Sequence, residues 1–240
     1  MHRLKADKLK KSFKTKEILH GISIEVKSKE VVGLLGPNGA GKTTSFYIVS
    51  GLLKPTSGSV YLDNEDISNL PLHKRAQKGI GYLPQESSIF KDLSVEENLE
   101  IAAEVALQDR VKREERIESV LEALNIEPIR SRRGINLSGG ERRRTEIARA
   151  LIKNPLFLLL DEPFAGVDPL AVSEIQELIK ELTEIGIGVL ITDHNVREML
   201  SICNRSYVIK EGSILAGGTS EEIESNPLVR EHYLGEHFKL

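Results

Sequence analysis

The sequence predicts an α/β protein in which a mostly parallel sheet core is interrupted by a helical insert. Short apolar segments alternate with segments of helical periodicity before about residue 84 and after about residue 156, the pattern of a parallel sheet. Between about residues 94 and 153 the periodicity is helical throughout. The 240 residues, 40% of them hydrophobic, are enough for one large domain or one domain with an insert.

The first third of the chain is predicted to contain mainly strands. GISIEV (21–26) alternates apolar and polar residues, as a half-buried strand does. VVGLLG (31–36) is continuously apolar, which suits a strand covered on both faces. A helix is expected from about Lys42 to Gly51, and GSVYLDNEDI (58–67) and GIGYLPQ (79–85) supply further strands.

The remaining elements follow from their start signals and periodicity. Ser94 and Glu97 have the spacing of a capping box, and helices are expected from there to about Asn125. The later elements are a helix over about 139–153, a strand over 156–161, a helix over about 169–186, a strand over 188–193, a further helix and a strand pair over 206–218.

Composition and charge exclude several classes of function. The net charge of −3 and the pI near 6.1 give no general attraction to nucleic acids. The single cysteine excludes an internal disulfide and fits a reducing compartment. The basic first residues are followed by no apolar core, so no secretory signal is expected. No apolar run approaches the roughly 20 residues that cross a bilayer, so any work at a membrane requires another chain to span it.

The segment GPNGAGKTT predicts a site for the phosphates of a nucleoside triphosphate. It matches G-x-x-x-x-G-K-[ST] and lies between an apolar strand and a helix, the context that confirms such a motif. Glycines let successive N–H groups point at phosphate, and the helix N-terminus adds its dipole. Lys42 supplies charge to the β- and γ-phosphates, and Thr43 a hydroxyl to Mg²⁺. The residues of this predicted site are Gly36, Pro37, Asn38, Gly39, Ala40, Gly41, Lys42, Thr43 and Thr44.

Two carboxylates end the apolar strand in LFLLLDEP (156–163). Asp161 is placed to hold Mg²⁺ through water. Glu162 is placed to polarise an attacking water as a general base, although a capping or surface carboxylate explains its position as well.

The segment LSGGE predicts a second anion-binding helix N-terminus. Ser138 and Glu141 fit a capping box, so an ordinary helix start is the alternative. Two glycines in a first helical turn each cost roughly 1 kcal/mol relative to alanine. That cost is explained if bare N–H groups approach an anion closely. A second such site in one chain indicates a ligand shared between two copies.

The chain resembles the ATP-binding cassette (ABC) ATPase family. GPNGAGKTT, LSGGE, LLLDEP, GVDP and the histidine of ITDHN occur in the family's order and cover essentially the whole chain. The resemblance implies a P-loop NTPase with a RecA-like core, an N-terminal antiparallel β subdomain and an inserted α-helical subdomain. Residues 1–240 then form one ATP-binding domain, with the core at about 1–84 and 156–240 and the helical part at about 94–153.

The resemblance also implies roles for single residues. In the family two subunits enclose two ATP molecules, which assigns Ser138, Gly139, Gly140 and Glu141 to the ATP of the partner. The residues implied to act in hydrolysis are Glu162 as base, His194 as γ-phosphate sensor and Gln85 as a contact of Mg²⁺ and water; Mg²⁺ is further assigned to Thr43 and Asp161, the dimer interface to Asp168, and adenine stacking to Phe13.

Three of these assignments have ordinary alternatives. Asp168 followed by Pro169 is a good helix N-cap, and both roles are compatible. His194 alone is more typical of a satisfied loop histidine, but its place after an apolar strand favours a site. Phe13 keeps an aromatic face for stacking without a hydroxyl, and core packing is its alternative.

Local features point to one branch of the family. The arginine run after LSGGE, the Asp-His order in ITDHNVRE and the ending YLGEHFKL resemble the ATPases of lipopolysaccharide export. This implies a homodimer on the cytoplasmic face of a bacterial inner membrane, with LptF/LptG-like permease subunits and an LptC-like partner. The alternatives are the ATPase of a branched-chain amino-acid importer and a nucleotide-dependent clamp or switch. The latter usually carries coiled-coil inserts or two cassettes, which this chain lacks.

The segment PQESSIFKDLSVEENL (84–99) predicts the contact with the membrane subunits. Ile89, Phe90 and Leu93 are expected to form an exposed apolar cluster, which often marks a protein contact. The resemblance implies that a short cytoplasmic helix of each permease docks there and moves with the helical part.

Overall fold

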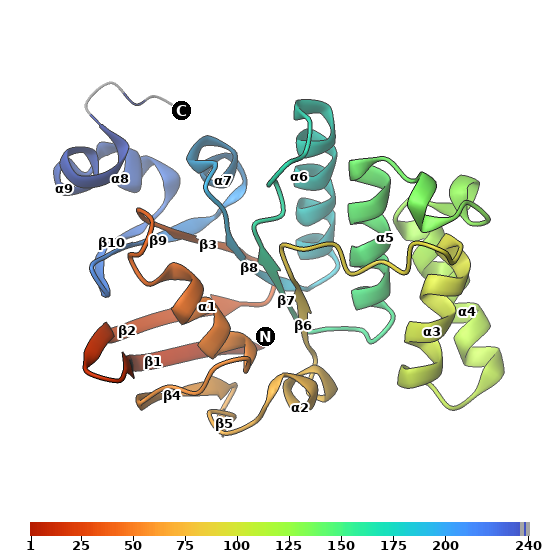
Figure 1. Ribbon diagram of the computed structural model, residues 1–240, viewed down its shortest axis with the longest axis horizontal. Helices are drawn as coiled ribbons and strands as arrows, with labels where there is room; N and C mark the ends of the chain where they lie inside the picture. Colours follow the sequence, from red (N-terminus) through yellow and green to blue (C-terminus); the bar gives the residue numbers. More distant parts are fainter. Residues whose placement is uncertain (236–237, 239–240) are drawn as a thin grey trace.

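The computed structural model describes residues 1–235 and 238, so the ending YLGEHFKL lies partly outside the described residues. The chain forms two sheets and the helices that flank them (Figure 1). The strands are β1 (Arg3–Phe13), β2 (Lys16–Lys27), β3 (Val31–Leu35), β4 (Ser57–Leu62), β5 (Glu65–Asp66), β6 (Ile80–Leu83), β7 (Phe157–Asp161), β8 (Gly188–Thr192), β9 (Arg205–Lys210) and β10 (Ser213–Gly218). The helices are α1 (Lys42–Ser50), α2 (Leu72–Gln77), α3 (Val95–Ala106), α4 (Arg110–Ala123), α5 (Gly139–Leu151), α6 (Pro169–Glu184), α7 (Val196–Ile202), α8 (Ser220–Ser225) and α9 (Pro227–Val229), with short turns η1 (Glu127–Ile129), η2 (Gly134–Asn136) and η3 (Arg230–Leu234).

The larger sheet confirms the predicted parallel core. Its strand order is β10-β9-β3-β8-β7-β6, and the pairs β9/β3, β3/β8, β8/β7 and β7/β6 are parallel. Only the edge pair of β9 and β10 is antiparallel. Connections between parallel strands need crossovers, and these supply the helices on the two faces of the sheet.

Successive residues of β3 divide between two apolar cores, because side chains of a strand point alternately to opposite faces. Val31 and Leu35 pack with α6, α7 and the helical part of the chain. Val32 and Leu34 pack with α1 and the N-terminal strands. The sheet is therefore covered on both faces, as the unbroken apolar sequence of β3 predicts.

The smaller sheet is antiparallel, in the order β2-β1-β4-β5. In Figure 1, α1 lies between this sheet and the larger one. β1 is long and rich in lysine, and its register against β2 is broken between Ala6 and Leu9. Lys8 at this irregularity has φ of 49°, which interrupts the alternation that would reveal a strand in the sequence.

The helical part forms one end of the molecule (Figure 1) and contains α3, α4 and α5. The predicted capping boxes at Ser94 and Ser138 are both present, with the serine accepting from the third helical N–H and the glutamate accepting in return. The helical stretch after Ser94 is divided into α3 and α4, because Asp109 caps a second helix start. Among residues 1–235 and 238, none of the helices has the length and hydrophobicity needed to cross a bilayer.

Candidate functional site

The strand order brings four loops to one edge of the larger sheet. β3, β8, β7 and β6 are adjacent and parallel, so their carboxyl ends meet along the same edge. The phosphate loop follows β3, His194 follows β8, Glu162 follows β7 and Gln85 follows β6. In open α/β sheets this edge is the usual place for a ligand.

The phosphate loop is held close against the neighbouring strand at its first glycine. Gly36 has φ of 141°, and a Cβ there would lie 2.0 Å from the carbonyl oxygen of Ile209. Helix α1 then begins after Gly41, with no side-chain cap and no acidic residue in its first turn. Its N-terminal N–H groups are therefore available to an anion, as the motif predicts.

Lys42 closes the phosphate loop from within. Its side chain is buried, and Nζ donates to the carbonyl oxygens of Gly36 at 2.6 Å and Pro37 at 3.0 Å. Burial lowers the pKa of Lys42, and the nearby Glu162 carboxylate partly opposes this. The ammonium group is thus fixed beside the loop backbone, where a phosphate would compensate its charge.

A cavity of about 310 Å³ joins the phosphate loop to the end of β1. Phe13 lies in its wall with 48% of its surface exposed, and Lys11 Nζ lies 5.0 Å from the ring centroid. His194 reaches the same cavity from the other side. The wall is formed by Phe13, Lys16, Ile18, Asn38, Gly39, Ala40, Gly41, Lys42, Thr43, Thr44 and His194.

Asp161 has the features of a carboxylate that a cation would complement. It is only 4% exposed, and within the described chain it has no basic side chain within ion-pair distance. Burial and the adjacent Glu162 charge raise the pKa of Asp161, while hydrogen bonds from the Tyr47 and Tyr82 hydroxyls lower it. Mg²⁺ typically takes one or two protein carboxylates together with substrate phosphates, so this set of donors fits that ion.

Glu162 and His194 are brought together by the pairing of β7 with β8. His194 Nε2 lies 2.7 Å from Glu162 Oε1. Glu162 has φ of 46°, unusual for a residue with a Cβ, and its N–H donates to Thr192 O at 2.7 Å. Such backbone strain is concentrated at functional sites. The carboxylate is 15% exposed and the imidazole 55%, so the pair opens toward solvent through the histidine.

Asp193 fixes this pair, a role that the sequence analysis missed. Its buried carboxylate accepts from Phe164 N and from Asn195 N, each at 2.9 Å. The first donor, Phe164, is two residues after Glu162, and the second donor, Asn195, is one residue after His194. An aspartate at the end of an apolar strand was the available signal, because a carboxylate that is buried needs such donors.

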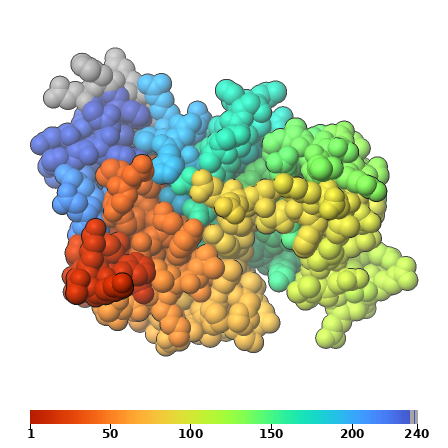
Figure 2. All heavy atoms as spheres, in the orientation of Figure 1, coloured from red at the N-terminus to blue at the C-terminus, as the bar shows by residue number. Residues whose placement is uncertain are grey.

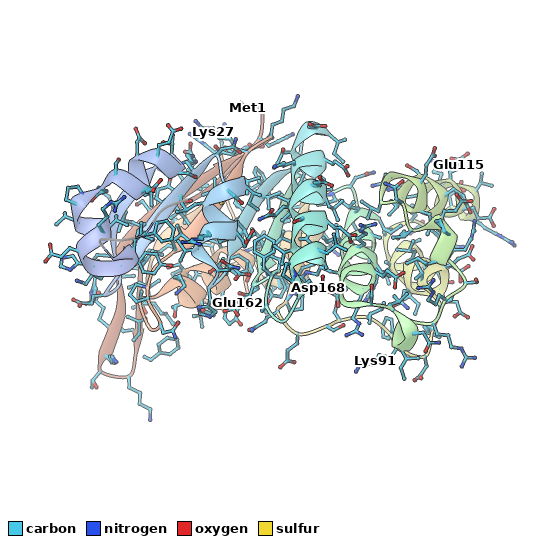
Figure 3. The ribbon with its side chains drawn as sticks, turned by 90° about the horizontal axis from the view of Figure 1, so that it is seen from above. Met1, Lys27, Lys91, Glu115, Glu162 and Asp168 are labelled. Carbon is cyan, nitrogen blue, oxygen red and sulfur yellow. The ribbon has the colours of Figure 1, made fainter. Side chains whose placement is uncertain are left out.

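The LSGGE segment starts α5 and lies apart from the cavity at the phosphate loop. Within the described residues, none of Ser138 to Glu141 contributes to the wall of that cavity. Gly139 is open, because a Cβ built there would have no neighbour within 4 Å. Figure 3 shows Glu162, Asp168 and Lys91 along one side of the molecule, opposite Met1, Lys27 and Glu115.

Gln85 and Asp168 occupy loops near the same edge. Gln85 is exposed, two residues beyond the end of β6. Asp168 caps α6, accepting from Ala171 N at 3.1 Å, with Pro169 in the first helical position. The predicted N-cap at Asp168 is therefore confirmed, and it leaves the side of the residue that faces solvent available for a second role.

The expected exposed cluster at Ile89, Phe90 and Leu93 is wrong in part. Ile89 is 7% exposed and belongs to the apolar core, because the chain turns inward there. Leu93 is half-buried, whereas Phe90 is 45% exposed. Phe90 lines a groove of about 310 Å³ between the core and the helical part. The groove is formed by Ala76, Ile80, Gly81, Tyr82, Leu83, Ser88, Phe90, Ile101, Ala102, Val105, Glu146, Arg149, Ala150, Lys153 and Pro155.

A phosphate loop, a strand-end carboxylate pair and a histidine at one edge of a parallel sheet define a P-loop nucleotide-binding protein. The ABC transporter family model matches residues 19–165. A second model, for branched-chain amino acid ATP-binding cassette transporters, matches residues 213–239. The chain therefore belongs to the ABC transporter family, and it is an ATPase of the ATP-binding cassette type.

Relatives of known name match over nearly their whole length. The lipopolysaccharide export system ATP-binding protein LptB of Haemophilus influenzae is 54% identical over 99% of both chains. The protein of the same name from Escherichia coli K12 is 51% identical over 100% of both chains.

Solved structures show the same fold. The ADP conformation of MJ1267, an ATP-binding cassette of an ABC transporter, has a TM-score of 0.89 at 32% identity and covers 98% of this chain and 100% of its own. A dimeric post-hydrolysis state of the ATP-binding cassette MJ0796, bound to ADP and Pi, has a TM-score of 0.76 at 27% identity and covers 90% of this chain and 98% of its own.

Proposed function

We propose that this chain is the ATP-hydrolysing subunit of a lipopolysaccharide export system. The observation that carries the proposal is the 54% and 51% identity, over nearly the whole length, to ATP-binding proteins of that system. Two copies act together on the cytoplasmic face of a bacterial inner membrane. LptF/LptG-like permease subunits cross the membrane, and an LptC-like protein accompanies them.

ATP binds in the cavity between the phosphate loop and β1. The loop N–H groups and Lys42 hold the β- and γ-phosphates, and Phe13 stacks on the adenine. The exposed face of Phe13 in the same cavity wall supports this arrangement. Thr43, Gln85 and Asp161 hold Mg²⁺, which when bound neutralises charge on the phosphates.

Hydrolysis depends on the side chains at the sheet edge. The Glu162 carboxylate accepts a hydrogen bond from the attacking water and takes up its proton as a general base. It can do so because it is largely shielded from solvent and held in place. His194 orients that carboxylate and contacts the γ-phosphate, and Gln85 contacts the water. The 2.7 Å contact between the His194 and Glu162 side chains supports a joint action.

The second half of each ATP site comes from the other copy. Ser138, Gly139 and Gly140 donate to the γ-phosphate bound by the partner, with Glu141 shaping the turn and Asp168 crossing the interface. The openness of Gly139 and the separation of this segment from the cavity at the phosphate loop support a ligand supplied from outside the chain. Residues 1–240 act as one ATP-binding domain in which the helical part, at about 94–153, moves relative to the core.

The groove at Phe90 receives a short helix of each permease subunit. Its lining includes the apolar side chains of Ile101, Ala102 and Val105, and it lies between the core and the helical part. Closure of the dimer on ATP moves the groove and the docked helices with it. A ligand shifts this equilibrium only through contacts that the open form lacks, and the shared γ-phosphate provides them.

A branched-chain amino-acid importer is the second candidate. It is favoured by the match of residues 213–239 to the family model of that importer. That match covers the C-terminal end alone, whereas the export relatives match throughout.

Reconstitution with candidate permeases decides between the two. We expect the chain to co-purify with LptF/LptG-like subunits, and the complex in liposomes to release lipopolysaccharide to an acceptor when ATP is supplied. Assembly with an importer's permeases, and with no release of lipopolysaccharide, would instead establish the importer.

A further inference from the structure

The loop that carries Gln85 is fastened to helix α5 by a buried glutamate. Glu146 is 4% exposed, and its Oε1 accepts from Ser87 Oγ at 2.7 Å and from Ser88 N at 2.9 Å. Its other oxygen, Oε2, accepts from Arg143 Nη1 at 3.0 Å. The carboxylate therefore has partners at both oxygens, and two of these belong to the loop.

The two arginines on the same helix complete the attachment. Arg143 Nη1 also donates to the Pro84 carbonyl at 3.2 Å, and Arg149 Nη1 donates to the Ser88 carbonyl. The loop is thus held on both sides of Gln85, at Pro84 and at Ser87–Ser88. Within the described chain, every hydrogen bond recorded for residues 84–88 goes to α5.

The loop is consequently anchored to the helical part and not to the core from which it emerges. β6 ends at Leu83, before the loop. After the loop the chain is bonded to α3 of the helical part, where Asn98 Oδ1 accepts from Phe90 N at 2.9 Å. Figure 2 shows the segment after β6 crossing the surface from the core to the helical part. Among the residues that the structure describes, no hydrogen bond recorded for residues 84–88 reaches the sheet.

The chemistry of the anchor indicates a purpose other than stability. A buried ion pair such as Arg143–Glu146 is seldom more stabilising than apolar residues of the same volume. Arg143 even leaves its Nε and Nη2 without a partner. We therefore explain this charged pair by the directional hydrogen bonds that it makes, and those bonds go to the loop at residues 84–88.

We propose that Glu146 is a positioning residue, which fixes the loop at 84–88 to α5 so that Gln85 and the LSGGE segment move as one body. This proposal rests on the proposed function, in which Gln85 contacts the ATP of its own chain and the LSGGE segment contacts the ATP of the partner. Since LSGGE starts the helix that holds Glu146, a shift at one ATP site is carried to the other through this anchor. Arg143, one residue of the arginine run after LSGGE, thereby gains a role.

The test compares Glu146→Gln with the parent chain in the assembled transporter. Hydrogen exchange reports on this attachment directly: we expect the Ser88 amide to exchange at least about tenfold faster, because its N–H loses a charged acceptor. ATP affinity is expected to stay unchanged while kcat falls about 10- to 100-fold, as misplacement of a reacting group does. Adding Gln85→Ala to Glu146→Gln should lower kcat no further than Gln85→Ala alone, because the two act through one group.

Two further variants guard against a general loss of structure. Glu30→Gln removes a partly buried Glu–Arg pair that joins Glu30 to Arg205 of β9, and it should change neither the exchange of the Ser88 amide nor kcat. Ser87→Ala removes one partly buried contact and keeps the Arg143–Glu146 pair, so it should show the same changes in exchange and kcat to a smaller extent.

The outcomes separate the two proposals. Unchanged exchange of the Ser88 amide in both Glu146→Gln and Ser87→Ala would overturn the attachment of the loop to α5. Faster exchange with unaltered kcat would overturn the positioning role. If Glu146→Gln loses activity but Gln85→Ala keeps full kcat, the anchor stands and the proposed role of Gln85 is wrong.

Discussion

His194 Nε2 lies 2.7 Å from Glu162 Oε1, and this contact joins the ends of two adjacent parallel strands. Main-chain hydrogen bonds fix the position of each residue. The Glu162 N–H donates to Thr192 O, and the turn that carries His194 is held by the bond from Asn195 N to the Asp193 carboxylate. The geometry of the pair therefore depends on the edge of the sheet, through Thr192 O and the Asp193 carboxylate.

Asp193→Asn should separate positioning from binding. An amide can accept from only one of the two N–H groups, so either Phe164 N or Asn195 N loses its partner in a buried place. We expect the free energy of unfolding to fall by about 1–3 kcal/mol. We also expect kcat to fall while ATP affinity is kept, which steady-state kinetics and calorimetry would measure.

Asp109→Asn is the matched control for that substitution. Asp109 caps α4, accepting from Lys112 N at 3.1 Å, and asparagine is an equally good N-cap. The Asp109→Asn variant should have the same free energy of unfolding and the same kcat as the parent chain. Equal effects of the two substitutions would contradict the role given to Asp193.

Lys42→Met should abolish nucleotide binding without weakening the fold. Because the pKa of Lys42 is lowered, the folded chain holds this proton less tightly than the unfolded chain, and the charge disfavours folding at neutral pH. This penalty shrinks as the pH rises toward the ordinary value of 10.5. We expect ATP affinity to fall about 100-fold or more, and the unfolding midpoint of the nucleotide-free chain to match or exceed that of the parent at pH 7. A clearly lower midpoint would show that the bonds to Gly36 O and Pro37 O dominate.

Phe90→Asp should uncouple the chain from its membrane partners. The ring is exposed in the groove, with Arg149 Cζ 4.9 Å from its centroid, so the folded core does not depend on it. We expect co-purification with the permease subunits to be lost while the free chain keeps most of its ATPase activity. Val111→Asp, at an apolar position on α4 that is even more exposed, should leave assembly intact. If Phe90→Asp assembles normally with the permease subunits, the groove at Phe90 is not the docking surface.

Cys203 should be inert in the folded chain. Burial raises the pKa of its thiol to about 12, so almost no thiolate exists at neutral pH. Alkylation by iodoacetamide, followed by mass spectrometry, should occur only after unfolding. Rapid labelling of the native chain would show that the region around α7 opens readily.

The α/β core and the phosphate site could be predicted because local sequence determines them. The apolar β3, the glycine loop and the start of α1 follow one another along the chain, and their residue types leave little choice. β1 could not be predicted in the same way, because the irregularity at Lys8 breaks its alternation. The division of the stretch after Ser94 into α3 and α4 likewise depends on the cap at Asp109, which periodicity does not reveal.

The parts of the site that escaped prediction are those made by tertiary contacts. Ile89 looks exposed beside Phe90 in the sequence, yet the turn at this point sends it into the core. Asp193 and Glu146 are single carboxylates in apolar or charged surroundings, and each has one near partner and at least one that is distant in the sequence: Phe164 for Asp193 and Ser87 for Glu146. Only the folded chain shows what a buried carboxylate accepts from.

If one ATP is held by two copies of the chain, Glu162→Gln should have the molar mass of a dimer in ATP and Mg²⁺. We expect this variant to bind ATP but to hydrolyse it about 100-fold or more slowly, because the general base is lost. Light scattering should then give twice the 26.7 kDa of one chain. Adding Gly139→Asp, tolerated within one chain because its Cβ meets no neighbour, should return the mass to that of one chain with ATP still bound. A single-chain mass for ATP-bound Glu162→Gln, or a dimer unaffected by Gly139→Asp, would contradict the shared site.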